Sequence, residues 1–155
     1  DPQLNWGDVE WIKKRWGGKL ILKGIMDAED ARLAVNSGAD ALIVSNHGGR
    51  QLDGAPSSIA ALPHIAEAVG KNIEVWMDGG IRSGQDVLKA RALGAQGTLI
   101  GRSFLYGLGA FGEAGVTRAL QIIQKELDIT MAFCGHTNIN NVDRSVLLPG
   151  TIPTL

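Results

Sequence analysis

The chain has 155 residues, of which 45% are hydrophobic and 20% are charged, and its formal net charge at pH 7 is −1. This length fits a single domain with a buried core, and the charge provides no basic field that would recruit nucleic acid or an anionic membrane. No apolar run reaches the roughly 18 residues that a membrane span needs, and the single cysteine, Cys134, cannot form an intrachain disulfide and fits a reducing compartment.

Four apolar runs rich in β-branched residues predict strands at 19–25, 41–46, 74–80 and 97–102. The runs are continuous rather than alternating, so both faces of each strand are expected to be buried, which is typical of a parallel sheet covered by helices. A weak internal repeat, in which GADALIVSN parallels GAQGTLIGR, favours successive βα units. Such units build either a doubly wound sheet or a TIM barrel.

A stretch with helical spacing follows each predicted strand. Pro63 lies inside the second of these stretches and predicts a kink or a later helix start. The third opens with a pattern that resembles a capping box, in which Asp86 replaces the usual Glu or Gln. The four helices are expected to begin at Asp27, at Ser57 or Ser58, at Ser83 and at about residue 113, with the last running to about 134.

Two features indicate that the chain is part of a larger structure. Four βα units make half of an eight-stranded barrel, which needs about 250 residues, and a free half would leave two parallel strand edges open. Trp6, Trp11 and Trp16 recur at a five-residue spacing that is poor for one helical face, and they are expected to dock against structure outside the chain. We therefore infer a fragment, a cleaved product or one of two associating halves. A complete small doubly wound domain is the alternative.

Polar and glycine residues gather directly after every predicted strand, at the end where both architectures place their active sites. Lys23 and Gly24 end the first run. A lysine at the end of a buried strand is costly to desolvate without an anionic or electron-rich partner. Lys23 is therefore expected either to form an ion pair with a nearby acid or to face a developing negative charge on a ligand.

The second run leads into SNHGGRQLDG at 45–54. The glycines beside His47 let a substrate approach the backbone, and Arg50 offers a planar two-pronged donor that matches a carboxylate. A base beside a carboxylate clamp predicts proton abstraction next to an acid group. A phosphate-binding arginine beside a bystander histidine is the alternative. Asp53 is expected to hold Arg50 or to cap the following segment.

Two glycine–arginine turns follow the last two runs, DGGIR at 78–82 and GRS at 101–103. Backbone N–H groups and guanidinium groups in such turns can hold one phosphate, and the last two strands of TIM barrels commonly form a phosphate site near a helix N-terminus. The phosphate can belong to a substrate or to a cofactor. The histidines lack metal-ligand spacing and no G-x-G-x-x-G opens a helix, which disfavours metal chemistry and a nicotinamide Rossmann domain.

In their order and separation, these motifs resemble the FMN-dependent L-2-hydroxy-acid oxidases and dehydrogenases, among which the bacterial L-lactate dehydrogenases are the most similar. The matching pieces are Lys23-Gly24, 45–54, 78–82, and Gly101-Arg102 followed by FLYGL. The resemblance covers nearly the whole chain. It implies an α/β fold, the C-terminal half of a TIM (β/α)8 barrel with about four βα units, in which residues 1–155 are half of an FMN-binding domain and the N-terminal half is absent from this chain.

The resemblance also implies FMN as the cofactor and a role for each motif residue. His47 is the active-site base, Arg50 pairs with the substrate carboxylate, and Lys23 stabilises negative charge on the reduced flavin. Ser45 lies near the flavin, and Asp78 contacts the ribityl chain. Further FMN contacts are implied for Gly79 and, around the phosphate, for Gly80, Arg82, Gly101 and Arg102.

The reaction implied is oxidation of an L-2-hydroxy acid, L-lactate, to the 2-oxo acid. A peroxide-producing oxidase, a non-catalytic half-barrel that binds FMN or phosphate, and a phosphate-handling metabolic barrel are the alternatives. Family members also use tyrosines and an aspartate from the N-terminal half. Tyr106 does not match those tyrosine positions, so this chain alone is expected to be inactive.

The expected partners follow from the same resemblance. They are the small 2-hydroxy acid, the N-terminal half of the barrel and further copies in a homo-oligomer, a tetramer in the family. No nucleic acid partner is expected. The implied location is the cytoplasm, with peripheral attachment to the inner membrane as the second arrangement.

Overall fold

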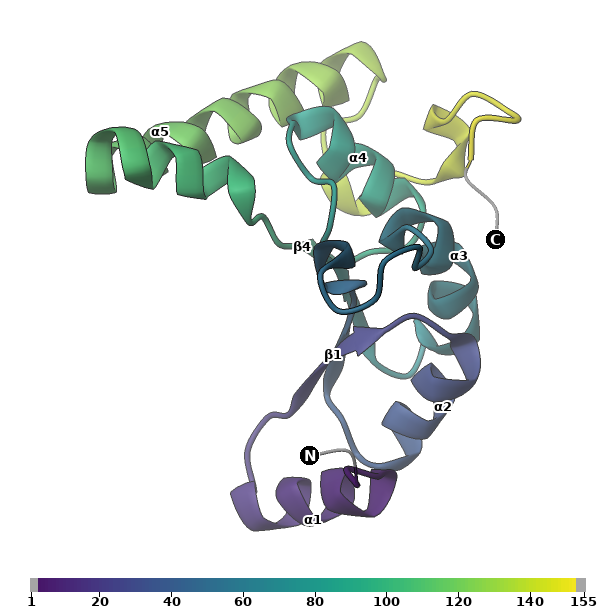
Figure 1. The fold of residues 1–155 in the computed structure, drawn as a ribbon. Helices are drawn as coiled ribbons and strands as arrows, with labels where there is room; N and C mark the ends of the chain where they lie inside the picture. Colours follow the sequence, from purple (N-terminus) through teal and green to yellow (C-terminus); the bar gives the residue numbers. More distant parts are fainter. Residues whose placement is uncertain (1–2, 153–155) are drawn as a thin grey trace.

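A computed structural model describes residues 3–152 of the chain. Helices and strands alternate after a first helix, with α1 at one end of the molecule and α5 at the other (Figure 1). The elements are α1 (Trp6–Trp16), β1 (Ile21–Ile25), α2 (Ala28–Asn36), β2 (Ala41–Val44), α3 (Ser58–Val69), β3 (Glu74–Met77), α4 (Gly84–Ala92), β4 (Gly97–Thr98) and α5 (Arg102–Phe133). Short 3-10 turns occur at His47–Gly49, Ile139–Asn141 and Arg144–Val146.

The four strands form one parallel sheet in the order β1-β2-β3-β4, so strands adjacent in the sequence are adjacent in space. Helices α2, α3 and α4 lie along one face of this sheet (Figure 1). Leu42 of β2 pairs with Leu22 and Val75 on its two neighbours, and its side chain is fully buried together with Leu62 and Ile65 of α3. The predicted parallel sheet of βα units is confirmed.

The burial predicted for the strands holds for β2, whose four residues are all buried. It is wrong for β3, where Glu74 is exposed, for β4, whose two residues are half-buried, and for β1. Ile21 is 42% exposed, because β1 is an edge strand of the sheet within residues 3–152. The last predicted strand is also shorter than expected, with only Gly97 and Thr98 in β4. Its pairing reaches one residue further, since the backbone N–H of Leu99 donates to the carbonyl of Met77 at 2.9 Å.

Side-chain caps confirm the predicted helix starts at Asp27 and Ser83. The Asp27 carboxylate accepts from the backbone N–H of Glu29 at 2.7 Å, and Ser83 and Asp86 form a reciprocal capping box. Helix α3 begins at Ser58, as predicted, and runs through Pro63 to its end. The later start is therefore wrong, and the kink at Pro63 stays a prediction.

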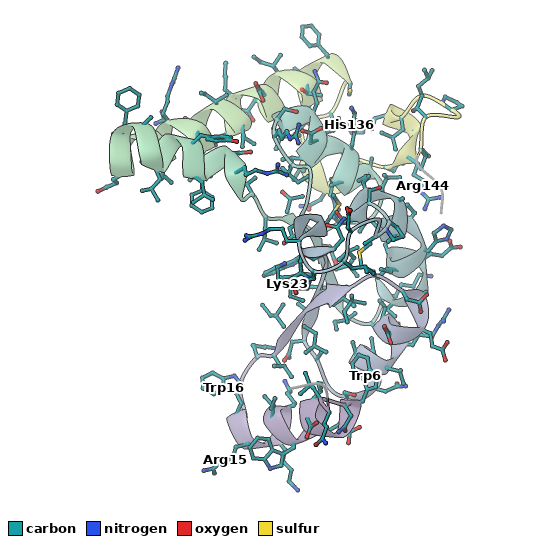
Figure 2. The ribbon with its side chains drawn as sticks, in the orientation of Figure 1. Trp6, Arg15, Trp16, Lys23, His136 and Arg144 are labelled. Carbon is teal, nitrogen blue, oxygen red and sulfur yellow. The ribbon has the colours of Figure 1, made fainter. Side chains whose placement is uncertain are left out.

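Helix α1 was not predicted, because tryptophans at five-residue spacing do not mark a helical face. Its start is set by a capping box between Asn5 and Asp8. Trp11 and Trp16 remain 65% and 67% exposed, and Figure 2 shows Trp16 at the edge of the molecule. Their docking against structure outside the chain stays a prediction. Across residues 3–152, no helix has the length and apolar character needed to cross a membrane.

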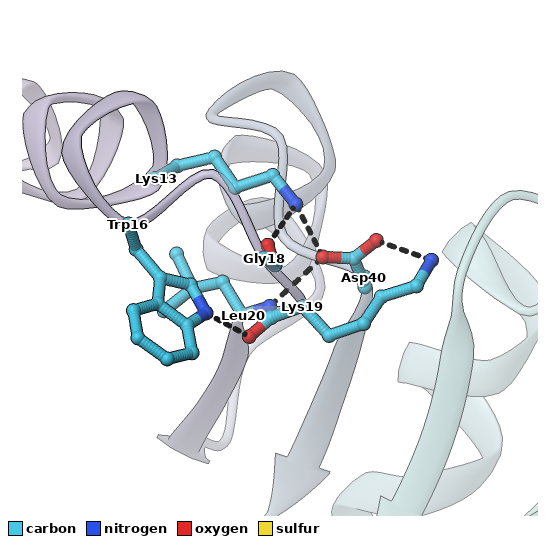
Figure 3. Close-up of polar contacts among 6 residues, drawn as sticks. All are labelled: Lys13, Trp16, Gly18, Lys19, Leu20 and Asp40. Atoms are coloured by element: carbon cyan, nitrogen blue, oxygen red, sulfur yellow. Dashed lines mark hydrogen bonds and ion pairs between the residues drawn. The ribbon is translucent and has the colours of Figure 1, made fainter.

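An ion cluster around Asp40 fastens α1 to the N-terminal ends of β1 and β2 (Figure 3). The Asp40 carboxylate pairs with the ammonium groups of Lys13 and Lys19, the latter at 2.9 Å, and accepts from the backbone N–H of Leu20 at 2.8 Å. The bond from Lys13 is the main cause that holds the pKa of Asp40 well below its usual range, followed by those from Lys19 and Leu20. This end of a βα sheet serves stability rather than chemistry.

The lowered pKa of Asp40 predicts a loss of stability in acid. Because the folded-state value lies below the unfolded value of about 3.9, the contribution is complete above that value and is lost as the pH falls below it. We expect Asp40→Asn to lower the melting temperature at pH 7 and to flatten its decline between about pH 4 and pH 2. Thermal unfolding across this range checks the prediction, with Glu67→Gln on the exposed side of α3 as the control. An unchanged acid slope in Asp40→Asn would contradict it.

Helix α5 is longer than the predicted helix at 113–134, because a second helical segment precedes it. The two segments meet at Phe111 and Gly112, whose backbone angles are not helical. They approach each other so closely that a Cβ atom on Gly115 would lie 1.9 Å from the carbonyl oxygen of Gly107. Glycines at this contact lower the apparent helix propensity of the first segment, which is why the sequence pattern did not reveal it.

Helix α4 packs equally closely against α5. A Cβ atom on Gly84 would lie 2.0 Å from the backbone nitrogen of Leu127, and the N–H of Gly84 donates to the Glu126 carboxylate at 2.9 Å. The obstructing atoms are backbone atoms, which cannot move aside as a flexible side chain does. This contact therefore requires glycine at position 84.

We expect Gly84→Ala to lower the free energy of unfolding by about 1–3 kcal/mol or more, the usual cost of overpacking a closed contact. Gly109→Ala is the matched control, because Gly109 is helical and a Cβ atom there would meet nothing within 4 Å. That control should be neutral or stabilising by about 0.4–1 kcal/mol. Chemical denaturation of both variants checks the pair, and equal stability of the two would contradict the packing account.

Candidate active site

A cavity of about 610 Å³ lies where the loops after all four strands meet. Every residue to which the resemblance assigns a catalytic or cofactor role lines it except Ser45, which is buried. The predicted residues on its wall are Lys23, His47, Arg50, Asp78, Gly79, Gly80, Arg82, Gly101 and Arg102.

Lys23 forms the ion pair that is one of its two predicted environments, and its role toward a ligand stays a prediction. Its ammonium nitrogen lies 2.7 Å from a carboxylate oxygen of Asp78, which confirms the ion pair, and it donates to the Ser45 hydroxyl oxygen at 2.7 Å. The Lys23 side chain is 39% exposed and lines the cavity. The ion pair therefore fixes a cation at the cavity without removing it from the space where a ligand would bind.

Asp78 has one carboxylate oxygen, Oδ1, that is buried and without a hydrogen-bond partner among the described residues. A buried acceptor without a partner is costly. Since Asp78 lines the cavity, a hydroxyl or N–H group of a bound ligand can satisfy this oxygen. The polar wall is thus complementary to a hydrogen-bond donor in the ligand.

The loop that carries His47 and Arg50 is shaped by Asn46. The Asn46 side chain accepts from the backbone N–H of Gly48 at 2.9 Å and donates to the carbonyl of Pro56 at 3.1 Å, closing the loop on itself. His47 has a φ of 55°, which is uncommon for a residue other than glycine and is found at functional sites. The loop therefore presents His47 and Arg50 to the cavity from a constrained backbone.

Asp53 makes a local contact within the same loop. Its carboxylate accepts from the backbone N–H of Gly54 at 3.1 Å. This contact reaches only the next residue and does not cap α3, whose N-cap is Ser57, so the capping role stays a prediction. The alternative, in which Asp53 holds Arg50, has no contact to support it among the described residues.

Gly24 makes room for the imidazole of His47. It lies at an irregularity in the pairing of β1 with β2, where the register shifts between Lys23 and Ile25. Its φ is 100°, and a Cβ atom at this position would lie 2.7 Å from Cε1 of His47. The glycine beside Lys23 is thus part of the packing of the candidate base.

The two glycine–arginine turns form the other end of the cavity. The Ser103 hydroxyl donates to the carbonyl of Ile81 at 3.1 Å, which ties the second turn to the first. Arg102 is the first residue of α5, so the positive end of the helix dipole faces this region. Exposed Arg82 and Arg102 side chains beside a helix N-terminus are suited to bind a phosphate.

Two supporting residues escaped the sequence interpretation. Asn46 precedes two glycines in a pattern typical of an Asx turn, and this signal could have revealed it. Ser58 was considered only as a helix start, yet its hydroxyl donates to the carbonyl of Asp78 at 2.5 Å. No local pattern reports that contact, because the two residues come from different βα units.

Comparison with known proteins places the chain among flavin enzymes. The L-lactate dehydrogenase of Caulobacter sp. (strain K31) is 53% identical over 147 residues, covering 95% of this chain and 39% of that protein. The L-lactate dehydrogenase of Pseudomonas syringae pv. syringae (strain B728a) is 51% identical over 148 residues, covering 96% and 39%. The chain therefore spans about 39% of the length of these curated relatives.

The solved structures agree with the sequence comparison. A mandelate oxidase variant with a monooxide FMN adduct superimposes with a TM-score of 0.88 at 45% identity, covering 91% of this chain and 45% of that chain. The fold is thus that of part of the mandelate oxidase barrel. The family model described as FMN-dependent dehydrogenase matches residues 1–149. The chain belongs to the FMN-dependent dehydrogenase family.

Proposed function

We propose that this chain forms the C-terminal half of an FMN-binding barrel in an enzyme that oxidises an L-2-hydroxy acid, L-lactate, to the 2-oxo acid. The observation that carries the proposal is that one cavity at the strand ends contains all of the following groups. It brings together a cation at Lys23, a histidine and arginine on one loop, and two arginines beside a helix N-terminus. The names of the Caulobacter and Pseudomonas relatives support L-lactate as the substrate.

The residues present fit FMN. Its phosphate suits the end of the cavity with Arg82 and Arg102, where a Cβ atom on Gly80 or Gly101 would meet nothing within 4 Å and the backbone is open to a ligand. A ribityl hydroxyl would supply the hydrogen-bond donor that Asp78 Oδ1 lacks among the described residues. When bound, FMN accepts the two electrons of the oxidation.

Lys23 would supply positive charge beside the flavin ring. Its ammonium group is held in place by Asp78 and Ser45 and remains partly exposed to the cavity. A fixed cation favours the charge that develops when the ring takes up electrons. The structural ion pair and the proposed catalytic role are therefore compatible.

His47 and Arg50 would act on the substrate. The guanidinium of Arg50 can bind the carboxylate with two parallel hydrogen bonds, which fixes the orientation of a small hydroxy acid. An imidazole nitrogen of His47, three residues earlier on the same loop, then takes a proton from the substrate. A histidine side chain can accept a proton near neutral pH.

The longer relatives support a further part of the proposal. We infer that the remaining barrel strands and further substrate contacts come from the part of the protein that corresponds to the rest of the relatives' length. Residues 1–155 alone would then be inactive, and activity would belong to the full-length protein, in which further copies form a homo-oligomer. Turnover of L-lactate at an enzymatic rate by the isolated chain would contradict this inference.

The test is an activity assay on full-length protein loaded with FMN. We expect reduction of a dye acceptor with L-lactate and little with D-lactate, because Arg50, His47 and the flavin would together fix three substituents of the α carbon, and the names of the relatives support the L hand. The alternative is an oxidase, which the mandelate oxidase neighbours favour. Stoichiometric peroxide in the presence of oxygen would support the oxidase, and the absence of FMN binding would overturn the proposal.

A further inference from the structure

We propose that Ser58 is a positioning residue of the cofactor site, which holds the Asp78-Gly79 turn in the orientation that binds FMN. Ser58 does not line the cavity and would not touch the cofactor. The inference rests on the proposed function, since it concerns the FMN site described above. Under this proposal, the first residue of α3 affects the affinity for FMN as well as the packing of the helix.

The contact is direct and buried. Ser58 is 3% exposed, and its hydroxyl donates to the carbonyl oxygen of Asp78 at 2.5 Å and lies 3.5 Å from that of Gly79. Ser58 belongs to α3, whose Leu62 and Ile65 are buried in the core against the sheet. The hydroxyl is therefore held by a rigid element rather than by a loop.

The turn has space for the Ser58 hydroxyl because residue 79 is a glycine. Gly79 has a φ of 88°, and a Cβ atom at this position would lie 2.7 Å from the Ser58 oxygen. A larger residue at 79 would push the hydroxyl away, and loss of the hydroxyl would leave the turn without this support. Ser58 and Gly79 thus form a matched pair.

The position of the turn sets the position of the Asp78 carboxylate. The backbone N–H of Asp78 donates to the carbonyl of Val44 at 3.1 Å, so β2 holds one side of this residue and Ser58 holds the other. Between these supports, one carboxylate oxygen reaches Lys23, and the other is buried without a hydrogen-bond partner among the described residues. Loss of the Ser58 bond releases one of the two supports.

The hydroxyl is not needed to begin the helix. Ser57 is the N-cap of α3, and its side chain makes no capping hydrogen bond. Ser57 is also exposed, whereas Ser58 is buried. The neighbouring serine therefore offers a matched control that changes the same helix terminus without touching the turn.

The experiment measures the dissociation constant of FMN for the apo form of the full-length protein, by quenching of flavin fluorescence. We expect Ser58→Ala to raise this constant about five- to tenfold, the effect of one lost buried hydrogen bond. Ser58→Thr, which keeps the donor, and Ser57→Ala should both stay within about twofold of the parent. Melting temperatures of the apo proteins separate a loss of fold from a loss of affinity.

The outcomes distinguish this inference from the proposed function. If the parent protein binds FMN and Ser58→Ala binds it equally well, the positioning role is wrong and the proposed function stands. Equal losses in Ser57→Ala and Ser58→Ala would also overturn it. If the parent binds no FMN, the proposed function itself fails. Should Ser58→Ala fail to fold, Ser58→Cys, which keeps the size with a weak donor, replaces it with the same expected direction.

Discussion

Replacing His47 with asparagine is expected to lower kcat for L-lactate oxidation by about 10²–10⁴-fold, the usual contribution of a positioned base. Asparagine suits the position, because it tolerates the left-handed backbone that His47 adopts at a φ of 55°. The backbone N–H at 47 can still donate to the Ser45 hydroxyl, a contact of 3.1 Å that does not involve the imidazole. The loop should therefore persist without its base, and the FMN content should match the parent.

Steady-state kinetics with L-lactate and the flavin absorbance of the purified protein check this prediction together. His64→Asn is the matched control, because His64 is exposed on α3 and does not line the cavity. It should retain the parent kcat. A His47→Asn protein that keeps more than about one third of the parent kcat would exclude His47 as the base.

Arg50→Lys is expected to raise KM for L-lactate by about 10–100-fold, the range for losing charge-assisted hydrogen bonds. Lysine keeps the positive charge but lacks the planar fork that binds both carboxylate oxygens. Arg50 is exposed on the cavity wall, so the substitution opens no void in the core. The loss should therefore appear in the kinetics and leave the melting temperature unchanged.

The kinetics of Arg32→Lys provide the control, since Arg32 is exposed on α2 and does not line the cavity. A second comparison uses lactamide, the neutral amide of lactate. The parent protein should discriminate strongly between acid and amide, and Arg50→Lys should discriminate less. If KM for L-lactate in Arg50→Lys stays within threefold of the parent value, Arg50 does not bind the substrate carboxylate.

The sequence was sufficient to predict the helices and strands that leave a local pattern of apolar or capping residues. The apolar run at 41–46 predicted β2, and Ser83 with Asp86 predicted the start of α4, because burial and capping leave a pattern within one turn or one strand. No local sequence pattern indicates that β1 lies at the edge of the sheet. Its composition matches a buried strand, and only the order of strands in the sheet shows that Ile21 is 42% exposed.

The candidate site followed from a topological rule rather than from any residue alone. Because parallel strands end on the same edge of a sheet, residues after strand ends meet there. This rule predicts that Lys23, His47 and Arg82 lie together, and all three line one cavity. The rule does not reveal the hydrogen bond from Ser58 to Asp78 or the close contact of Gly24 with His47, because each joins residues of different βα units.

The measurement that tests the central claim most directly is the visible spectrum of the full-length protein under anaerobic conditions, before and after addition of L-lactate or D-lactate. We predict a flavin spectrum that bleaches with L-lactate and persists with D-lactate, which reports cofactor, reaction and handedness in one experiment. A flavin that stays oxidised with L-lactate would contradict the proposed substrate. A protein that holds no flavin even after FMN is added would contradict the account as a whole.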